Sequence, residues 1–192
     1  MPRSEPRERP ILFSGPMVKA ILAGEKTQTR RVITAKGAQS LSIAYWRPAG
    51  QPENAGRWVA SDGLPIGHIA CPYGAPGDRL WVRETFREAD VGVRFRADLG
   101  GADVDPGGWT PSIFMRRRLS RIDLEVTAVR VERLQEITEE DARAEGSSFM
   151  PSAAPGLRYR FHLGWDSLNE KRGYGWAKNP WVWVVSFKRL RP

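Results

Sequence analysis

The chain has 192 residues, of which 41% are hydrophobic and 27% are charged. This composition is that of an ordinary one-domain globular protein, and it excludes a disordered or fibrous chain. The longest purely apolar run near the C-terminus, residues 181–185, is too short to cross a bilayer, so no membrane partner is expected.

The charge balance favours an anionic partner. Lys and Arg number 30 against 22 Asp and Glu, which gives a net charge of +8 at pH 7. Such a balance is typical of proteins that bind RNA, DNA or a phosphorylated ligand. The single cysteine and the two histidines predict no disulfide framework, no metal site and no cofactor. A reducing, cytoplasmic compartment is therefore expected.

The first elements predicted along the chain surround a basic cluster. Residues 1–10 alternate charges and prolines, which predicts a disordered tail and no secretory signal. Residues 11–13 predict a short strand, and Ser14 then begins a helix that ends near Gly24. The β-branched residues within 27–33 predict a second strand. The basic cluster thus lies where a helix meets a strand.

The middle of the chain predicts an elaborated connection followed by strands. Residues 34–76 are rich in Gly, Ala, Pro and Ser without a sustained period, which indicates a long insertion. Its aromatic residues indicate packing on the main body or over a cleft. Residues 80–84 alternate, so Glu84 is expected on an otherwise apolar strand face. A further strand is predicted at 91–97, followed by a Gly-rich and Asp-rich connection at 98–108.

The C-terminal part predicts two strands and two helices. Residues 121–134 alternate strongly and then slip in phase, which indicates a β-bulge. Thr138 is a helix N-cap before an acidic first turn, and Phe161 and Trp165 have helical spacing. Residues 181–187 predict the final strand. We expect residues 11–192 to form one α+β domain, a small mixed β-barrel with peripheral short helices and inserted loops.

The basic cluster is the most suggestive group of residues. Lys26, Thr29, Arg30 and Arg31 bring one amine, one hydroxyl and two guanidinium groups within six residues. Three cations this close need anions nearby. The cluster is compatible with a solvated surface patch and equally with an anion-binding cleft.

Several segments resemble ASCH-domain proteins, a branch of the PUA-like superfamily. The run GPMVKAILAGEKTQTRRV resembles the family signature and carries its G-x-K-x-x-x-x-R pattern at Gly24, Lys26 and Arg31. The segments GDRLWVRET and LQEITEEDARAEG add to the resemblance. The closing NPWVWVV is similar to the end of phage and prophage-type members.

The resemblance implies a compact β-barrel with a cleft for RNA or a nucleoside. Some small ASCH proteins are amidohydrolases that remove acyl groups from N4-acylated cytidine with a Lys, a Thr and a Glu. Lys26 and Thr29 occupy the matching K-x-x-T positions, and Glu84 is the best match for the carboxylate. The resemblance thus implies that Thr29 attacks an amide carbonyl, Lys26 acts as base and Glu84 protonates the leaving group. The insertion at 34–76 departs from these small enzymes.

The protonation states are open at this point. Lys26 can act as a base only if burial or neighbouring cations lower its pKa, and Arg30 and Arg31 act in that direction. A close Glu84 carboxylate would raise the pKa of Lys26, unless its apolar strand face keeps Glu84 protonated.

A non-catalytic RNA-binding module is the alternative. In that interpretation Lys26, Arg30 and Arg31 bind phosphates, Arg116 extends the basic path, and Trp109 stacks on a base. Trp109 is equally compatible with anchoring a loop or the core. A metal-independent ribonuclease is a third interpretation, because Lys and Arg can stabilise the charge of a phosphorane.

Overall fold

The computed structural model describes residues 5–34, 45–46, 57–59, 65–68, 71–100, 107–150 and 155–190. The strands are β1 (Glu8–Leu12), β2 (Gln28–Val32), β3 (Tyr45–Trp46), β4 (Arg57–Val59), β5 (Pro65–His68), β6 (Arg79–Arg83), β7 (Phe86–Glu88), β8 (Val93–Phe95), β9 (Asp123–Arg133) and β10 (Trp181–Arg189). The α-helices are α1 (Gly15–Leu22), α2 (Glu139–Ala144) and α3 (Leu157–Asn169).

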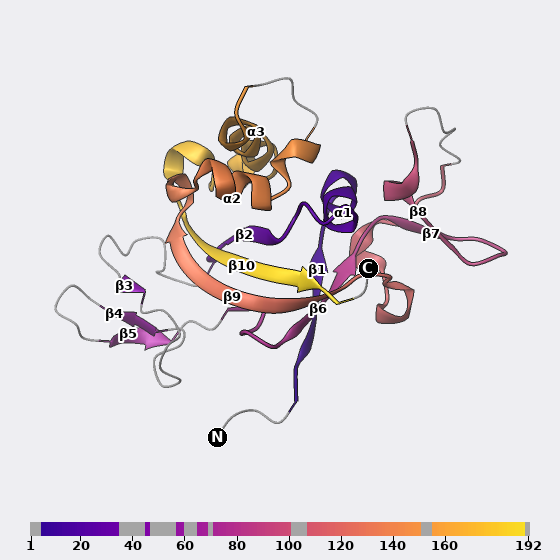
Figure 1. Cartoon of the computed structure of the whole chain (residues 1–192), viewed down its shortest axis with the longest axis horizontal. Helices are drawn as coiled ribbons and strands as arrows, with labels where there is room; N and C mark the ends of the chain where they lie inside the picture. Colours follow the sequence, from indigo (N-terminus) through magenta and orange to yellow (C-terminus); the bar gives the residue numbers. More distant parts are fainter. Residues whose placement is uncertain are drawn as a thin grey trace.

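A curved five-stranded sheet forms the body of the molecule. Its strand order is β1-β6-β9-β10-β2, in which β1 runs parallel to β6 and every other neighbouring pair is antiparallel. The two long strands β9 and β10 bend together around one side, and the three α-helices lie on that side (Figure 1). The predicted α+β class is confirmed.

The described strands do not close into the predicted barrel. β1 and β2 are the two edges of the sheet and are not neighbours in it. The helix that joins them, α1, buries Val18 and Ile21 in the main core, so side chains fill the gap between the edges. Arg31 of β2 crosses the gap and donates from Nη2 to the carbonyl oxygen of Leu12 in β1 at 2.6 Å.

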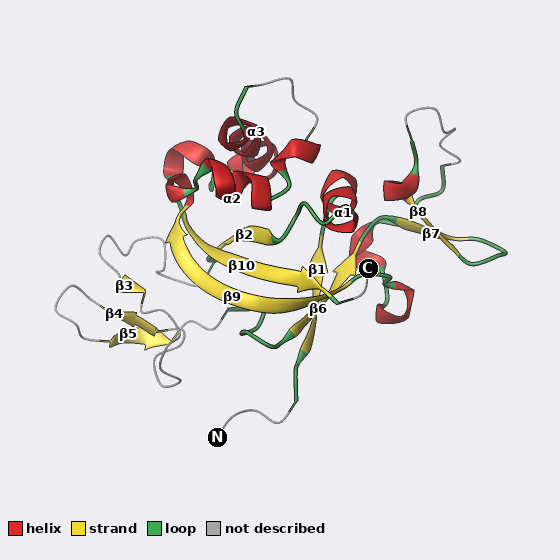
Figure 2. Cartoon of the chain, viewed as in Figure 1, coloured by secondary structure: helices red, strands yellow, loops and turns green. Residues whose placement is uncertain are grey.

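The helices cover the sheet in two places (Figure 2). α1 packs in the main core, which also holds Leu80 and Leu124 of the sheet. α2 and α3 pack over β10 in a second core of Leu134, Ile137, Ala142, Phe161, Trp165, Val182 and Val184. Burial of apolar side chains of this size stabilises a fold by roughly 1.5–3 kcal/mol each. No helix among the described residues is long and apolar enough to span a membrane.

The bulge predicted in the long strand is confirmed. The register between β9 and β10 shifts between Ser186 and Phe187, which face Ala128 and Val126. Thr127 is therefore the extra residue on β9, at the place where the hydrophobic alternation slips in phase.

The predicted N-terminal tail is too long. β1 begins at Glu8, so residues 8–10 are part of the sheet and not of a disordered tail. Parallel pairing with β6 holds them, and the Arg79 amide donates to the carbonyl oxygen of Arg7 at 2.8 Å. Residues 1–4 of the predicted tail lie outside the described residues.

Two connections contain strands that the sequence patterns did not predict. Within residues 34–76, β3, β4 and β5 form an antiparallel sheet of their own, and the rest of 35–70 lies outside the described residues. The strand predicted at 91–97 is present as the shorter β8, which pairs in a hairpin with the unpredicted β7 and is followed by a 3-10 turn at Arg96–Asp98. Strands of two to four residues are too short to show a period of two.

Gly146, which follows the C-cap of α2, has a left-handed backbone conformation and also lacks space for a side chain. Its φ is +79°, and an added Cβ would lie 2.9 Å from Cβ of Ala20 and 3.2 Å from Cβ of Lys26. Gly24 has nearly the same φ, +78°, but an added Cβ there would meet nothing within 4 Å. A substitution at Gly24 would therefore cause backbone strain alone, whereas the same substitution at Gly146 would cause backbone strain and steric overlap.

We expect Gly146→Ala to lower the free energy of unfolding by about 1–3 kcal/mol more than Gly24→Ala, because only Gly146 is overpacked by the methyl group. Both variants carry the shared cost of a left-handed backbone, about 1–2 kcal/mol. Urea denaturation of both variants beside the wild type measures the difference. Equal losses of unfolding free energy in the two variants would show that α1 moves away from the added methyl group at little cost.

Candidate functional site

Lys26 is a buried cation between α1 and β2. Its side chain is 2% exposed. Nζ donates to the carbonyl oxygen of Gln28 at 2.7 Å, to the carbonyl oxygen of Glu145 at 2.7 Å and to Oε2 of Glu145 at 2.9 Å. Burial lowers the pKa of Lys26, and the Glu145 carboxylate opposes this shift. The solvated surface patch is therefore excluded for Lys26.

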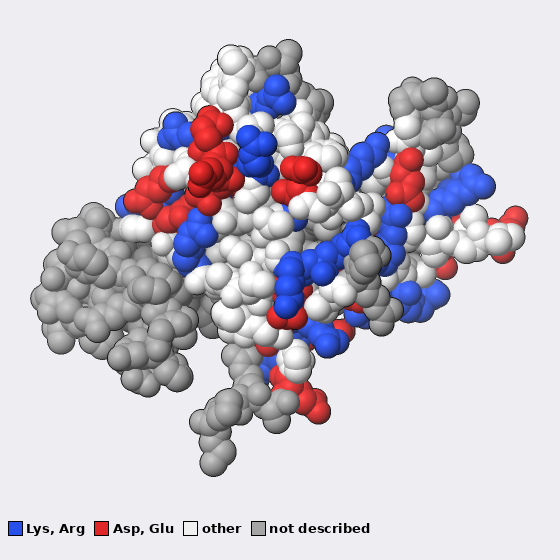
Figure 3. Space-filling model, viewed as in Figure 1, with Lys and Arg blue, Asp and Glu red and all other residues white. Residues whose placement is uncertain are grey.

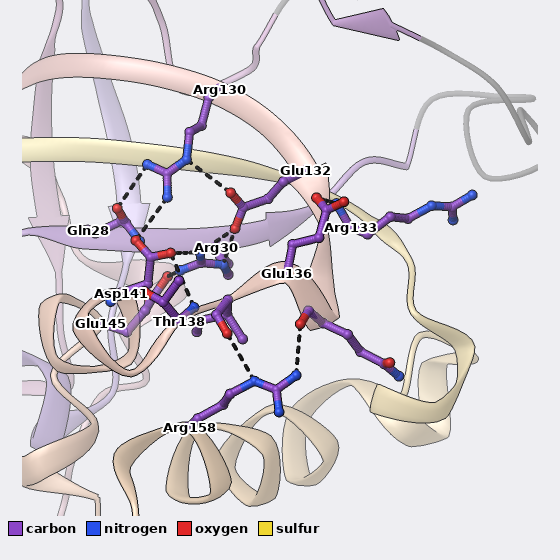
Figure 4. Close-up of polar contacts among 12 residues, drawn as sticks. Gln28, Arg30, Arg130, Glu132, Arg133, Glu136, Thr138, Asp141, Glu145 and Arg158 are labelled. Carbon is purple, nitrogen blue, oxygen red and sulfur yellow. Dashed lines mark hydrogen bonds and ion pairs between the residues drawn. The ribbon is translucent and has the colours of Figure 1, made fainter.

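Arg30 is also buried, and three carboxylates surround it (Figure 4). Its guanidinium donates to Oε1 of Glu132 through both Nε and Nη2, and through Nη2 to Oδ2 of Asp141 at 3.0 Å. Nη1 donates to Oε1 of Glu145 at 3.2 Å. Arg130 completes this ion-pair network by bonding Glu132 and Asp141 at 3.0 and 2.9 Å.

The network joins distant parts of the chain and is balanced in charge. Three cations, Lys26, Arg30 and Arg130, meet the three carboxylates of Glu132, Asp141 and Glu145. Buried charges cost several kcal/mol each unless they are paired and hydrogen bonded. The arrangement therefore places Lys26 and Arg30 rigidly.

Glu145 is the residue that sequence reasoning missed. It is the carboxylate in contact with Lys26, a position that the resemblance left to Glu84. Asp141 in the first turn of α2 and Glu145 at its C-cap are four residues apart and thus on one face of the helix, but this spacing does not identify Lys26 as a partner. The capping box between Thr138 and Asp141 begins this short helix and sets its rotation.

Lys26 and Thr29 line the same cavity. Its volume is about 350 Å³, within the range of small-molecule sites. Thr29 is buried on β2 and Glu145 lies in the wall beside Lys26. The wall consists of Leu12, Phe13, Ser14, Met17, Lys26, Thr29, Arg30, Arg31, Thr85, Ser112, Glu145, Met150, Phe161, Gly164, Trp165, Leu168 and Asn169. An amine, a hydroxyl and a carboxylate thus face a space that is otherwise largely apolar and aromatic.

Glu84 lies in a neighbouring cavity. It follows β6, is 2% exposed, and accepts from Arg121 Nε at 2.9 Å and Nη2 at 3.0 Å. Burial raises the pKa of Glu84, while Arg121 opposes the shift. Its cavity, of about 530 Å³, shares Ser14 and Thr85 with the Lys26 cavity. Glu84 is therefore adjacent to the site but does not pair with Lys26.

The two other predicted contacts lie elsewhere. Trp109 and Arg116 are absent from the described walls of the Lys26 cavity and of the Glu84 cavity. Arg116 is exposed between two 3-10 turns, and Trp109 is partly buried in the loop that pairs with β7. Figure 3 shows Lys and Arg side chains running across one face towards β7 and β8, with acidic side chains gathered over α2. No group of three or more metal-ligating side chains occurs in the described part of the chain.

Comparisons with known proteins give structural neighbours. No family model matches the chain, and no curated protein matches it. A structure of the ASCH domain from Lactobacillus crispatus JV V101 is similar at 12% identity and TM-score 0.46, over 95% of this chain and 79% of that one. A protein of Enterococcus faecalis V583, of family model DUF984, is similar at 9% identity and TM-score 0.44, over 98% of this chain and 82% of that one.

One of these neighbours is thus an ASCH domain, the family that the sequence motifs resemble. The motifs at residues 15–32 and 134–146 carry the resemblance, and both segments contribute side chains to the Lys26 cavity.

The ionisation of Asp141 makes the stability of the ion-pair network depend on pH. Burial acts to raise its pKa, but bonds from Gln28, Arg30 and Arg130 prevail and hold the pKa below its ordinary value. The stability from these bonds is fully present above the unfolded pKa, about 3.9, and is lost as pH falls through the lower folded pKa. We expect Asp141→Asn to lower the free energy of unfolding at pH 7 by about 1–3 kcal/mol.

The difference between Asp141→Asn and wild type should disappear in acid, where both carry a neutral side chain at this position. Glu140→Gln, an exposed neighbour in the same helix, is the matched control and should change stability little at either pH. Chemical denaturation at neutral and at acid pH measures both. A loss independent of pH would contradict the assigned ion pairs.

Proposed function

We propose that the Lys26 cavity is the active site of an amidohydrolase that removes an N4-acyl group from a cytidine-type nucleoside, either free or within RNA. One observation carries the proposal. A buried lysine and a buried threonine three positions apart face one cavity of nucleoside size with aromatic walls. The cavity offers a place for substrate beside the two residues that match the K-x-x-T pattern, which supports the proposal.

The chemistry follows from the residues that line the two adjoining cavities. Oγ1 of Thr29 attacks the acyl carbon, and its proton passes to a neutral Lys26 Nζ. The carbon–nitrogen bond then breaks, and the amine leaves with a proton supplied by Glu84. Water cleaves the acyl–threonine ester, which releases the carboxylic acid and restores the hydroxyl. Lys26 then loses its extra proton to solvent and Glu84 regains one from solvent, so both return to their starting states. Burial favours the neutral amine of Lys26 and the protonated Glu84 that these steps need.

Non-catalytic RNA binding is the second candidate, and one observation favours it. Lys26 Nζ donates to three acceptors, and only an ammonium has three N–H groups to do so. A lysine held in this way is a fixed positive charge. In that case the net charge of +8 serves to bind phosphates, with an affinity that falls steeply as salt rises.

Hydrolysis of N4-acetylcytidine by the purified protein tests the proposal. We expect Thr29→Val and Lys26→Met each to reduce kcat/KM by about 100-fold or more, because they remove the nucleophile and its base. Thr27→Val is the matched control, since Thr27 is exposed one residue before β2. Thermal melting confirms that each variant is folded.

Equal turnover by Thr29→Val and Thr27→Val would contradict the assignment of the nucleophile. Absence of turnover in the wild type, together with RNA affinity that falls with salt, would establish the second candidate in its place.

Glu84 as proton donor makes a separate prediction. Glu84→Gln should slow release of cytidine by about 10²-fold. It should change turnover of 4-nitrophenyl acetate much less, because that leaving group departs without a proton. Glu88→Gln, an exposed glutamate of β7, is the control and should leave both rates unchanged. Since burial raises the pKa of Glu84, the wild-type rate on N4-acetylcytidine should fall as pH rises through that pKa.

Loss of both activities in Glu84→Gln to the same extent would assign Glu84 to structure alone, through its bonds to Arg121.

A further inference from the structure

Arg31 differs from the other cations of the cluster. Lys26 and Arg30 both pair with carboxylates. Among the described residues no carboxylate pairs with Arg31, whose Nη2 donates to the carbonyl oxygen of Leu12 and whose buried Nε has no partner. Arg31 lies over the ring of Phe13 at 5.3 Å and interacts electrostatically with Glu145, but unlike its neighbours it has no directly bonded carboxylate. It therefore points to an anion that is supplied from outside the chain.

A second cavity provides the space for that anion. It has a volume of about 540 Å³, and Arg31 lies in its wall together with Arg172 and Tyr73. Arg31 also lines the Lys26 cavity, as do Leu12, Arg30, Trp165, Leu168 and Asn169. The two cavities thus adjoin across one shared wall. A ligand that occupied both cavities would contact Lys26 in the first and Arg31 and Arg172 in the second.

The described wall of this second cavity carries positive charge from arginine side chains. None of the described residues of its wall is acidic. Arg172 donates from Nη1 to the amide oxygen of Asn169 at 3.2 Å, a neutral partner. Burial lowers the pKa of Arg31, Tyr73 and Glu145 oppose this shift, and the charge of Arg172 adds to it. Two guanidinium groups beside one space match a phosphate, which accepts bonds from both and carries enough negative charge to compensate them.

We propose that the cavity between Arg31 and Arg172 binds the phosphate of a nucleoside phosphate ester, so that the ligand of this protein is a nucleotide unit and not a free nucleoside. The inference rests on the proposed function for the place of the base and acyl group in the Lys26 cavity. The phosphate subsite itself rests on the two guanidinium groups, which have no directly bonded carboxylate among the described residues. It assigns Arg31 and Arg172 to substrate selection.

Calorimetric titration with cytidine, cytidine 5′-monophosphate and a cytidine dinucleotide tests the subsite at low salt. We expect a phosphate-bearing ligand to bind at least about tenfold more tightly than cytidine. Arg172→Gln should remove most of this advantage and leave cytidine affinity unchanged. Its side chain is exposed, so the fold should tolerate the change. Arg31→Gln should act in the same direction.

Arg118→Gln is the matched control. It removes one exposed positive charge, outside the described wall of this cavity, whose partner is Glu88. It should leave the preference for phosphate intact. A preference for the monophosphate identifies a phosphomonoester, and a preference confined to the dinucleotide identifies a phosphodiester of RNA. Either supports the subsite when Arg172→Gln removes it.

Equal binding of the three ligands, no detectable binding of either phosphorylated ligand, or equal losses in Arg172→Gln and Arg118→Gln would overturn the subsite. The outcome is separable from the fate of the amidohydrolase. Thr29→Val should retain the phosphate preference while it loses turnover. A wild type that prefers the phosphate but never releases cytidine counts against the proposed reaction alone. Turnover with no phosphate preference counts against the subsite alone.

Discussion

The side chain of Glu145 is the contact on which the site depends. It comes from the end of α2 and binds both Lys26, before β2, and Arg30, within β2. All three side chains are buried, so the loss of this one carboxylate would leave Lys26 without a paired anion inside the protein and would remove one of the three carboxylates that pair with Arg30. The same contact fixes α2 against the sheet and fixes the amine in the cavity. Stability and the geometry of the site therefore have a common origin.

This arrangement places opposing demands on Lys26. Burial favours a neutral amine, which a catalytic base needs, while three hydrogen-bond acceptors favour an ammonium. Lys26 is thus poised between a structural and a chemical role, and the two candidate functions correspond to the two protonation states.

The two arginines of β2 differ in the charges that surround them. Arg30 points into the balanced network with Glu132, Asp141 and Glu145. Arg31, the next residue, points to the other face of the strand, as alternation requires, and meets no carboxylate among the described residues. One face of the strand therefore stabilises the protein, while the other presents a positive charge to the adjoining cavity.

Local pattern was sufficient for several of the elements and for part of the site. The apolar spacing near Ile21, the phase slip after Val126 and the N-cap at Thr138 each depend on residues close in sequence, and each marks an element that the structure contains. Lys26 and Thr29 are three positions apart in a single segment, and both line one cavity. Tertiary structure alone decided which carboxylate meets Lys26. Glu145 lies 119 residues away, and ion pairs over such separations arise from packing of α2 on the sheet and leave no local pattern. The same holds for the open edges of the sheet and for the positions of Trp109 and Arg116 outside the described walls of the cavities.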